Sequence, residues 1–376
     1  MNRKVQFLGT ALLASMIVAA PAMAATTLKA AYFVSPKHPI GVGYQFLADE
    51  LKRETKGALN LRIFPGESLL GAKAISDGVR DQVADMGHVV MTYTPAYYPH
   101  GVVLNDLSMV GEDDIAAIMA VTELMLQRCP GCLAESAKQK QVLLSGLVIP
   151  AYVIIANGDF NSPEKIKLKK LRAAGSLWDR WCRSVGAVAV NMPTAGMYEA
   201  MSRGTLDGAL YAVGGLKSHG LGDIAKQVIM LNTGSFRAGS LYSINQTSWR
   251  SLNVDERRSF LKAIPKAVIH TTLTALEANE EGLKIAKAKN IPVVQPHPEL
   301  LRMRNEFVEN DLKLTVKNAS EKLHLADGAE FVANFRKLYD KYEKLVKPLG
   351  KDEKKLSELL YNEIYAKLDV ATFGMK

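Results

Sequence analysis

The sequence predicts an α/β protein of two lobes joined by a hinge, a clamshell, with bracing helices at its C-terminal end. Strand-like and helix-like segments alternate from residue 28 to residue 91, and the same alternation begins again after Pro150. From about residue 255 the chain changes to long, charged, amphipathic helical patterns. Because 376 residues exceed what one hydrophobic core usually supports, two lobes are the expected arrangement.

Residues 1–24 have the layout of a secretory signal peptide. Arg3 and Lys4 precede an apolar stretch, residues 5–20, and the leader ends in Pro-Ala-Met-Ala before Ala25. The apolar stretch is shorter than the roughly 20 residues that span a membrane. A retained membrane anchor is the alternative, but no run of basic residues follows the leader to stop its transfer. We therefore expect a periplasmic protein whose mature chain begins at residue 25.

Residues 25–150 are expected to form the first lobe, completed by part of 240–300. Apolar residues alternate with polar ones in the strand segments, and turn residues such as Pro65-Gly66 separate the segments. A β-α-β-α-β series of this kind favours a largely parallel sheet. The expected elements are strands at 28–34, 59–63 and 86–91 and helices at 41–53 and 72–83.

Residues 151–239 are expected to form the second lobe. Ser162 and Pro163 suit the N-cap and the first position of a short helix. The other expected elements are strands at 152–156, 170–173, 187–190 and 208–212 and helices at 177–185 and 195–202.

Residues 255–376 are predicted to be helical, with one extended interruption at 291–296, and to brace the two lobes. No repeat or linker separates the lobes, so we expect the chain to cross between them more than once. Hinge closure around a ligand is the motion that such a clamshell permits.

The charge of the chain favours anionic solutes over nucleic acid. The formal net charge is +9, and the leader contributes two basic residues and no acid, which leaves +7 for the remainder. A moderately basic exported protein fits an anionic solute or partner surface. No tract of interleaved aromatic and basic residues indicates nucleic-acid binding.

Three cysteines are few for an exported chain of this length, so the fold must depend on its core. Cys129 and Cys132, separated by Pro-Gly, could close a small disulfide and leave Cys182 unpaired. A redox-active pair is the alternative, since a Cys-x-x-Cys motif that opens a helix has a lowered thiol pKa. Here the motif follows a helical stretch at 116–127 instead of opening a helix, which disfavours the redox role. The sequence leaves open whether the two thiols are joined.

The sequence lacks the signatures of common enzymes. It has no Gly-x-Ser-x-Gly, no His-Glu-x-x-His and no histidine–cysteine cluster with metal-ligand spacing, and its seven histidines are scattered. We therefore predict no catalytic residue, no metal site and no cofactor.

Two sets of short motifs run along the predicted lobes. The first lobe has His-Pro at 38–39, Glu-Thr-Lys-Gly at 54–57, Phe-Pro-Gly-Glu-Ser-Leu-Leu-Gly at 64–71 and Asp-Met-Gly at 85–87. The second lobe has Ser-Pro-Glu-Lys-Ile at 162–166, Leu-Arg-Ala at 171–173, Val-Gly-Ala at 185–187, Met-Pro at 192–193, Tyr-Glu-Ala-Met at 198–201 and Leu-Asp-Gly at 206–208. In order and spacing the second set resembles the periplasmic receptor subunits of TRAP transporters, the C4-dicarboxylate-binding family, which are periplasmic-binding-protein clamshells.

The resemblance implies that Arg172 forms a bidentate salt bridge with a substrate carboxylate. The position also suits this role physically, because Arg172 closes a predicted strand and ligands of open α/β sheets lie beyond the carboxyl ends of strands. A planar guanidinium matches the two oxygens of a carboxylate. The following helix, opening near Ser176, would direct its N-terminal N–H groups at the same anion.

Other candidate site residues are weaker. Trp178, Tyr93, Tyr152 and Phe236 are candidates for apolar walls, since ligand sites are mostly apolar; each is also a candidate core residue. Glu67 either bonds a substrate hydroxyl or ammonium group or caps the next helix.

The chain departs from the family pattern after Asp207-Gly208. The family commonly has an asparagine there that touches the ligand carboxylate, whereas this chain has Ala209 and continues to Gly214-Gly215. The change argues against the usual small dicarboxylates. The glycines leave room and expose backbone N–H groups, so Gly214 is a candidate contact for a bulkier or aromatic monocarboxylate.

The resemblance implies an extracytoplasmic receptor that captures a small organic acid and delivers it to the small and large integral membrane subunits of a TRAP permease. Three alternatives stay open. The protein could be a ligand-sensing subunit for a membrane signalling receptor, the binding protein of an ABC importer, or, least favoured by the motifs, a periplasmic enzyme.

Overall fold

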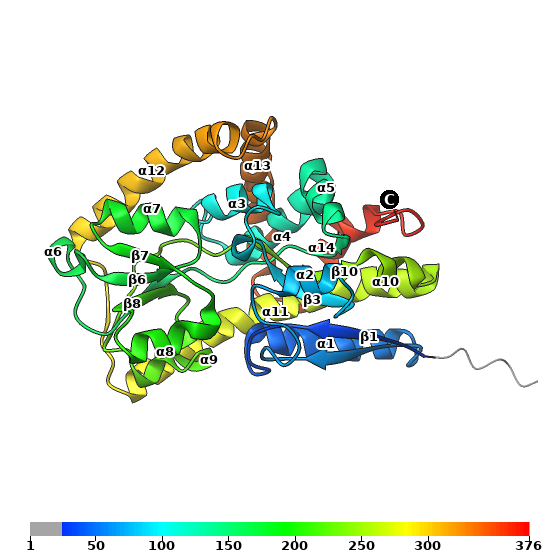
Figure 1. Ribbon diagram of the computed structural model, residues 1–376, viewed down its shortest axis with the longest axis horizontal. Helices are drawn as coiled ribbons and strands as arrows, with labels where there is room; N and C mark the ends of the chain where they lie inside the picture. The colour runs from blue at the N-terminus through cyan, green and yellow to red at the C-terminus, as the bar shows by residue number, and fades with distance from the viewer. Residues whose placement is uncertain (1–24, 376) are drawn as a thin grey trace, which may run out of the picture.

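Two separate β-sheets organise the protein, one in each lobe, as the sequence predicts. The computed structural model describes residues 25–375, so the predicted signal peptide lies outside the described residues. Figure 1 shows the two lobes side by side, with the C-terminal helices across them. The first sheet has the order β2-β1-β3-β10-β4 and the second the order β11-β9-β5-β8-β6-β7.

The first lobe surrounds the first sheet. Its strands are β1 (Thr26–Ala31), β2 (Leu59–Phe64), β3 (Met86–Val90), β4 (Gln141–Leu143) and β10 (Gly239–Asn245). Its helices are α1 (Pro39–Glu54), α2 (Ile75–Arg80), α3 (Pro99–Asp106), α4 (Asp114–Glu123), a π-helical turn (Leu124–Arg128) and α5 (Pro130–Lys138). Each predicted element of this lobe is present, although α2 is shorter than the predicted helix at 72–83.

The second lobe surrounds the second sheet. Its strands are β5 (Val153–Ala156), β6 (Lys170–Ala173), β7 (Val188–Asn191), β8 (Gly208–Tyr211), β9 (Gln227–Ile229) and β11 (Val293–Val294). Its helices are α6 (Pro163–Ile166), α7 (Ser176–Ser184), α8 (Met197–Ser202) and α9 (Gly215–Ser218). The Ser162 hydroxyl accepts a hydrogen bond from the Lys165 N–H, as its predicted N-cap role requires.

The prediction of a largely parallel sheet in the first lobe is wrong, because that sheet is mixed, and the sheet of the second lobe is mixed as well. In the first sheet β10 runs antiparallel to β3 and β4, and in the second β5 runs antiparallel to β8 and β9. The reason is the connectivity, because β5 and β10 are the strands on which the chain arrives from the other lobe. Each of these two strands enters its sheet from the side of the cleft. It therefore runs in the opposite direction to the strands that are joined by helices on the outer face.

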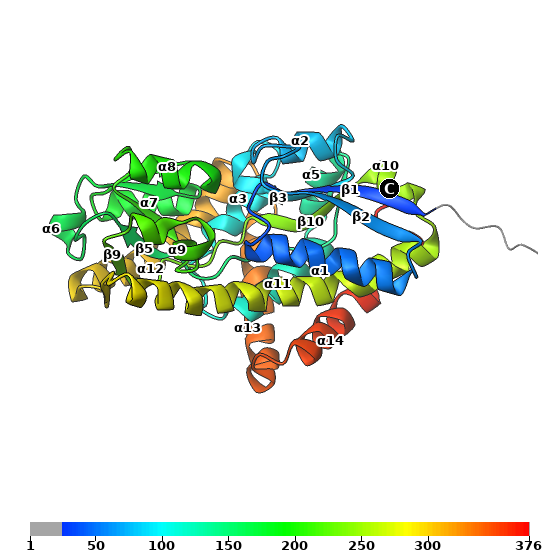
Figure 2. The ribbon, with the colours of Figure 1, turned by 90° about the horizontal axis from the view of Figure 1, so that it is seen from below.

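Long helices join the lobes. They are α10 (Gln246–Ser251), α11 (Val254–Ala288), α12 (Pro298–Glu321), α13 (Gly328–Val346) and α14 (Glu353–Glu363). Helix α11 begins with a capping box in which Asn253 and Glu256 each accept a backbone N–H of the other. It packs on α1 of the first lobe and on α9 of the second, so a single helix crosses the cleft (Figure 2). The helices of this region therefore brace the two lobes, as expected.

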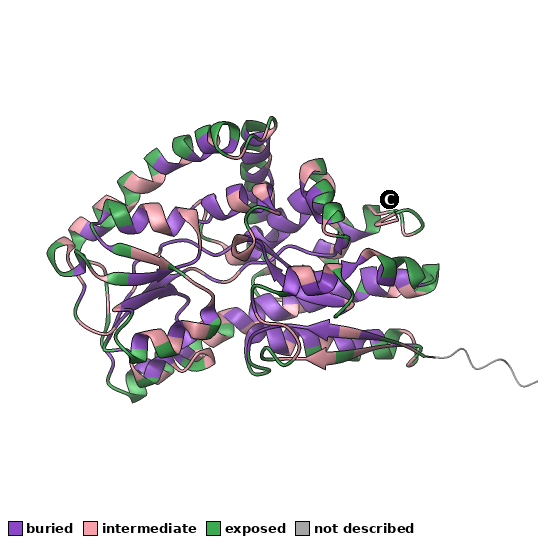
Figure 3. Cartoon of the chain, viewed as in Figure 1, coloured by how far each residue is buried: buried purple, intermediate pink, exposed green. Residues whose placement is uncertain are grey.

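Burial is continuous from one lobe into the other. The central strands of both sheets are buried, the edge strands β2, β7 and β11 are partly exposed, and the outer faces of α11, α12 and α13 are exposed (Figure 3). Within residues 25–375, none of the helices is both long enough and apolar enough to span a bilayer.

The cysteine pair forms a disulfide. Cys129 and Cys132 are joined, and Cys182 is buried and unpaired. The expectation that this motif does not open a helix is wrong, because Cys129 is the N-cap residue of α5. The chain passes from the π-helical turn directly into α5, and Pro130 at the first position begins a new helix where the periodicity of the preceding one ended. Both cysteines are buried, which limits access by a redox partner.

Candidate functional site

A cavity lies where the two lobes face each other. The cavity volume is about 30 Å³, which is enough for one or two water molecules. Both lobes and the segments that cross between them contribute its walls. The lining residues are Phe33, Val34, His38, Ile40, His88, Val90, Tyr93, Leu147, Ile149, Tyr152, Arg172, Thr194, Tyr211 and Phe236.

Arg172 supplies the positive charge of this cavity. It is the third residue of β6 and its side chain is 1% exposed. Its Nε donates to the Met192 carbonyl at 3.0 Å, and one terminal nitrogen donates to the Leu210 carbonyl at 3.4 Å. No acidic side chain among residues 25–375 forms an ion pair with it. Its side-chain partners include the Tyr152 hydroxyl but no carboxylate, so the guanidinium keeps donors available for an anion.

Tyrosines maintain the charge of Arg172. Burial by itself would lower its pKa, but the neighbouring Tyr93, Tyr152 and Tyr211 outweigh that effect and raise the pKa. The Arg172 guanidinium also lies 5.9 Å from the centre of the Tyr211 ring. The group is therefore a permanent cation in a space lined mainly by aromatic, aliphatic and uncharged polar side chains.

Aromatic rings form one wall of the cavity in two layers. Tyr152 and Phe236 line the space, with ring centres 6.4 Å apart and planes within 15°. Trp178 lies behind them, 4.8 Å from Tyr152 and 6.1 Å from Phe236, and its indole N–H donates to the Thr233 carbonyl at 2.8 Å. Trp178 thus supports the wall without lining it.

A hydrogen-bonded chain of histidine and tyrosine crosses from the first lobe to the second. The Ile40 N–H donates to His38 Nδ1 at 3.2 Å, so a neutral His38 must carry its proton on Nε2. That nitrogen donates to the Tyr211 hydroxyl at 3.2 Å, which leaves the Tyr211 proton for His219 Nε2 at 3.0 Å. Burial lowers the pKa of His38 well below its usual value and that of His219 to about 4. Both rings are therefore neutral at physiological pH.

A second set of contacts joins the lobes at the outer cleft. Arg180 of α7 donates to both carboxylate oxygens of Asp311 in α12, at 2.6 and 2.7 Å, and to Asp106 of α3 at 3.2 Å. Ser176 donates its hydroxyl proton to the same Asp106 at 2.5 Å. At the N-terminus of α7 the Ser176 side chain therefore bonds Asp106, and the expectation that the N–H groups of this helix help to bind the ligand anion stays a prediction.

Of the other predicted site residues, Tyr93 lies in the cavity, whereas Glu67 and Gly214 do not. Tyr93 lines the cavity with Arg172, Tyr152 and Phe236, and its hydroxyl accepts from the Thr194 N–H across the lobes at 3.3 Å. Glu67 lies outside it and accepts from the Ala72 N–H at 3.0 Å, in the turn before α2. The predicted capping role is wrong, because α2 begins after Ala74 and receives no side-chain cap.

Gly214 also lies outside the cavity. It packs against α11, where a Cβ at position 214 would lie 3.1 Å from Ala278, and its N–H donates to Asn279 Oδ1 at 2.8 Å. This glycine therefore allows close approach of the bracing helix.

Several residues that line the cavity were not predicted from the sequence. Phe33, His88, Thr194 and Tyr211 line the space. One signal existed for Tyr211, since it stands two residues after Ala209, where the family asparagine is missing. His88, on a predicted buried strand, was indistinguishable from a core residue.

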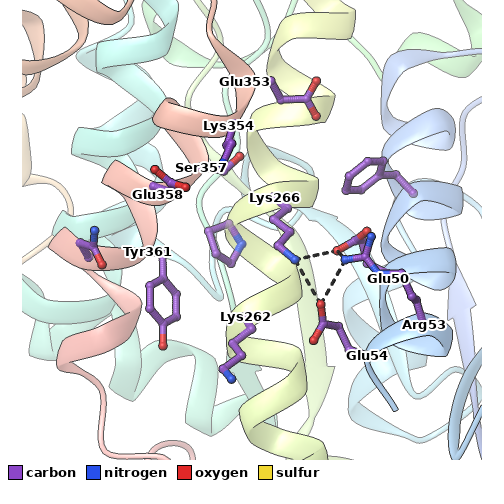
Figure 4. A pocket seen from close by; sticks show the side chains of 13 residues that line it. Glu50, Arg53, Glu54, Lys262, Lys266, Glu353, Lys354, Ser357, Glu358 and Tyr361 are labelled. Atoms are coloured by element: carbon purple, nitrogen blue, oxygen red, sulfur yellow. Dashed lines mark hydrogen bonds and ion pairs between the residues drawn. The ribbon is translucent and has the colours of Figure 1, made fainter. Parts of the chain in front are cut away.

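A larger hollow of about 580 Å³ lies on the outside of the first lobe, between α1, α11 and α14. Figure 4 shows Lys266 of α11 bonded to Glu50 and Glu54 of α1, at 2.9 and 3.2 Å. Arg53 also bonds both glutamates. These four side chains pair with one another, while Lys262, Lys354 and Glu358 add further charges of both signs to the same hollow. The hollow therefore lacks the single buried cation that distinguishes the cavity between the lobes.

Comparisons with known proteins agree with this arrangement. The chain matches the family model for bacterial extracellular solute-binding proteins, family 7, over residues 30–319. It is 24% identical to a solute-binding protein of Albidiferax ferrireducens over 50% of this chain, a match that spans only about half (55%) of that relative's length. It is 22% identical to the C4-dicarboxylate-binding periplasmic protein DctP of Rhodobacter capsulatus, over 73% of this chain and 81% of that protein.

Solved structures share the fold. One is a marine-metagenome TRAP solute-binding protein specific for aromatic acids, in complex with 3-hydroxybenzoate; it is 19% identical, covers 85% of this chain and 99% of its own, and has a TM-score of 0.76. Another is a pyroglutamic acid receptor of Bordetella pertussis, 20% identical over 83% of this chain and 100% of its own, with a TM-score of 0.72. The chain therefore belongs to bacterial extracellular solute-binding protein family 7 and has the fold of the TRAP periplasmic receptors.

Proposed function

We propose that this protein is the extracytoplasmic receptor of a TRAP-type transporter and that it captures a small organic acid through a salt bridge between the acid's carboxylate and Arg172. The observation that carries the proposal is the buried guanidinium without an acidic partner in the cavity between the lobes. Leaving such a charge unpaired is costly, and a carboxylate is the group whose two oxygens fit it.

The cavity favours a flat, largely apolar monocarboxylate. Phe33, Tyr93, Tyr152, Tyr211 and Phe236 surround Arg172, and no second cationic side chain lines the space. A dicarboxylate would place its second charge among these aromatic rings, where burial is costly. An aromatic ring would instead stack on them.

Capture requires the lobes to move. An organic acid is larger than the present space, so it enters when the lobes part and is enclosed when they come together again. The Tyr93–Thr194, His38–Tyr211 and Asp106–Arg180 contacts each join one lobe to the other. A ligand favours this closed state only by binding it more tightly than the open state. The closed surface of both lobes would be the feature that the small and large membrane subunits of a permease recognise in the periplasm.

A thermal-shift screen followed by calorimetry tests the proposal. The panel comprises benzoate, phenylacetate, pyroglutamate, succinate, malate, pyruvate and galactonate, tested with the chain from residue 25 onward. A specific ligand raises the melting temperature by mass action. We expect an aromatic monocarboxylate to give the largest shift and Arg172→Gln to abolish it.

Arg203→Gln is the matched control, because Arg203 lies exposed at the end of α8 in the same lobe. A shift that persists unchanged in Arg172→Gln contradicts the salt bridge. Tight binding of succinate or malate without binding of any aromatic acid contradicts the ligand class.

A further inference from the structure

Three side chains that can bind a metal ion meet in the first lobe, and none of them lines the cavity between the lobes. They are His100 of α3 and Cys129 and Cys132 at the start of α5. One ligand atom of each residue lies within 4.8 Å of those of the other two, and all three residues are buried. Spacing along the chain did not indicate this cluster, because α4 and the π-helical turn separate His100 from the cysteines.

Two carboxylates hold the His100 ring. Glu135 Oε1 lies 2.5 Å from Nδ1, and the same carboxylate accepts from the His100 backbone N–H at 3.2 Å. Asp327, at the N-terminus of α13, lies 3.1 Å from Nε2. The Glu135 side chain is 12% exposed and that of Asp327 is 42% exposed. Asp327 is therefore the partner that can more easily exchange its hydrogen bond for another contact.

The loop between the cysteines lies directly on the His100 ring. A Cβ atom at Gly131 would be 2.7 Å from Nε2 and 3.0 Å from Nδ1, so Nε2 is the nitrogen nearer to this loop. Pro130 is exposed and Gly131 is partly exposed, which places the cluster immediately below the surface.

We propose that the reduced form of this cluster is a zinc site formed by Cys129, Cys132 and His100 Nε2. Asp327, beside Nε2, supplies the fourth ligand. Two thiolates, an imidazole and a carboxylate are ligands that Zn²⁺ binds in tetrahedral geometry, and two residues between the cysteines is a usual spacing. Glu135 keeps Nδ1 and orients the ring, as carboxylates behind zinc-bound histidines do. The disulfide and the zinc site exclude each other, and the inference does not depend on the proposed function.

The charges around the cluster suit a cation. Within residues 25–375, neither Glu135 nor Asp327 forms an ion pair with a lysine or an arginine, and His100 is the ionisable partner of both. Reduction by a phosphine breaks the S–S bond, transfers the oxygen of one water molecule to phosphorus and leaves a proton on each sulfur. Both thiols and Nε2 then release their protons to the buffer when the ion binds.

Cobalt titration tests the proposal, because Co²⁺ replaces Zn²⁺ and reports thiolate ligands through a charge-transfer absorption band. The chain from residue 25 onward is reduced with a phosphine in urea and refolded without oxygen, and its three thiols are counted. We expect the band in the reduced protein, its loss when Zn²⁺ is added, and no band in the disulfide form. A reduced chain that does not refold even with Zn²⁺ present overturns the proposal, since zinc bound to the native state stabilises that state.

Variants assign the ligands. Glu135→Gln keeps every ligand and should weaken zinc binding roughly tenfold to a hundredfold. His100→Gln removes a ligand and should weaken it further. Cys182→Ser is the matched control, because Cys182 is a buried thiol of α7 in the second lobe and should leave the cobalt band unchanged. A band that is unaltered in Cys132→Ser, or lost in Cys182→Ser, overturns the proposal.

X-ray absorption of the zinc-loaded, reduced wild-type protein needs no variant. The spectrum should show two sulfur ligands and two lighter ligands. Zinc surrounded only by nitrogen and oxygen, or the absence of a cobalt band in the refolded protein, overturns the proposal. Neither result bears on solute capture, which the thermal-shift panel tests with the disulfide intact.

Discussion

Arg172 and Arg237 are both almost completely buried, yet their surroundings differ. Arg237 donates to the carbonyls of Leu107, Val110 and Gly111 and to the Ser235 hydroxyl. Arg172 donates to two carbonyls, one of them at the long distance of 3.4 Å. Burial lowers the pKa of Arg237 to about 10 despite nearby Asp114 and Tyr339, whereas tyrosines raise that of Arg172. The Arg237 Nε is also buried without a hydrogen-bond partner, so a buried arginine marks a candidate binding site only when its guanidinium lines a cavity, as that of Arg172 does.

The largest expected effect separates the two arginines by ligand binding. Arg172→Gln should weaken carboxylate binding by about 4 kcal/mol, roughly a thousandfold, because it removes the cation from a desolvated charge pair. The free energy of unfolding without ligand should fall by less than about 1 kcal/mol, since the removed charge had no acidic partner to lose. Calorimetry and urea unfolding of the same variant measure both values. A large loss of stability with retained binding would assign Arg172 to the core.

Replacing Arg237 should instead lower the stability of the protein. Arg237→Met removes donors from four acceptors and leaves Asp114 without its neighbouring cation, so we expect a loss of about 3 kcal/mol in the free energy of unfolding. Ligand affinity of the folded fraction should stay within about threefold of wild type, because Arg237 does not line the cavity. Urea unfolding followed by calorimetry below the transition checks this. A thousandfold loss of binding in Arg237→Met would show that the two arginines do not differ in this way.

The pH dependence extends the contrast to histidines. The folded-state pKa values of His88 and His219 are lowered to about 4, chiefly by burial. Their contribution to stability is therefore complete above the unfolded value of about 6.5 and declines as the pH falls towards 4, by about 1 kcal/mol for each group at pH 5.5. Urea unfolding measured from pH 7.5 to pH 5 should show a fall in the free energy of unfolding. This fall should be smaller in His88→Phe than in the wild type.

His100 should behave in the opposite sense. Burial would lower its pKa, but bonds to Glu135 and Asp327 raise it above its usual value. Its contribution is therefore present at low pH and is lost as the pH rises through the raised value. The fall in unfolding free energy towards pH 5 should therefore persist in His100→Gln. If His100→Gln abolished it and His88→Phe did not, assigning it to the cavity histidines would be wrong.

The smallest expected effect concerns Arg180, which joins the lobes. Arg180→Gln removes its contacts to Asp106 and Asp311 and should destabilise the closed state, weakening ligand binding about fivefold, or by about 1 kcal/mol. Arg183→Gln is the control, because Arg183 pairs only with Asp179 on the same helix. Calorimetry of both variants measures the difference. Equal affinities would mean that this contact does not contribute to closure.

Much of the fold, and the presence of Arg172 in the candidate site, could be predicted from the sequence alone. Strand and helix periodicity located most of the predicted elements to within a few residues, and Ser162 correctly marked a helix start. The elements α3, α5, α9, β4, β9 and β10 were not predicted. The position of Arg172 at the end of a strand, together with the motifs around it, identified the candidate anchor. Periodicity records whether a residue is buried, which suffices for local structure because burial on one face sets the pattern.

The neighbours of each buried residue were decided only by the tertiary structure. The sequence does not encode locally that β5 and β10 arrive from the other lobe, and so it could not give their antiparallel direction. For the same reason Trp178 and Phe236 were equivalent candidates until packing placed one behind the other. His88, Tyr211 and Arg172 come from separate strands far apart in the chain, and only the closed arrangement of the two sheets brings them to one cavity.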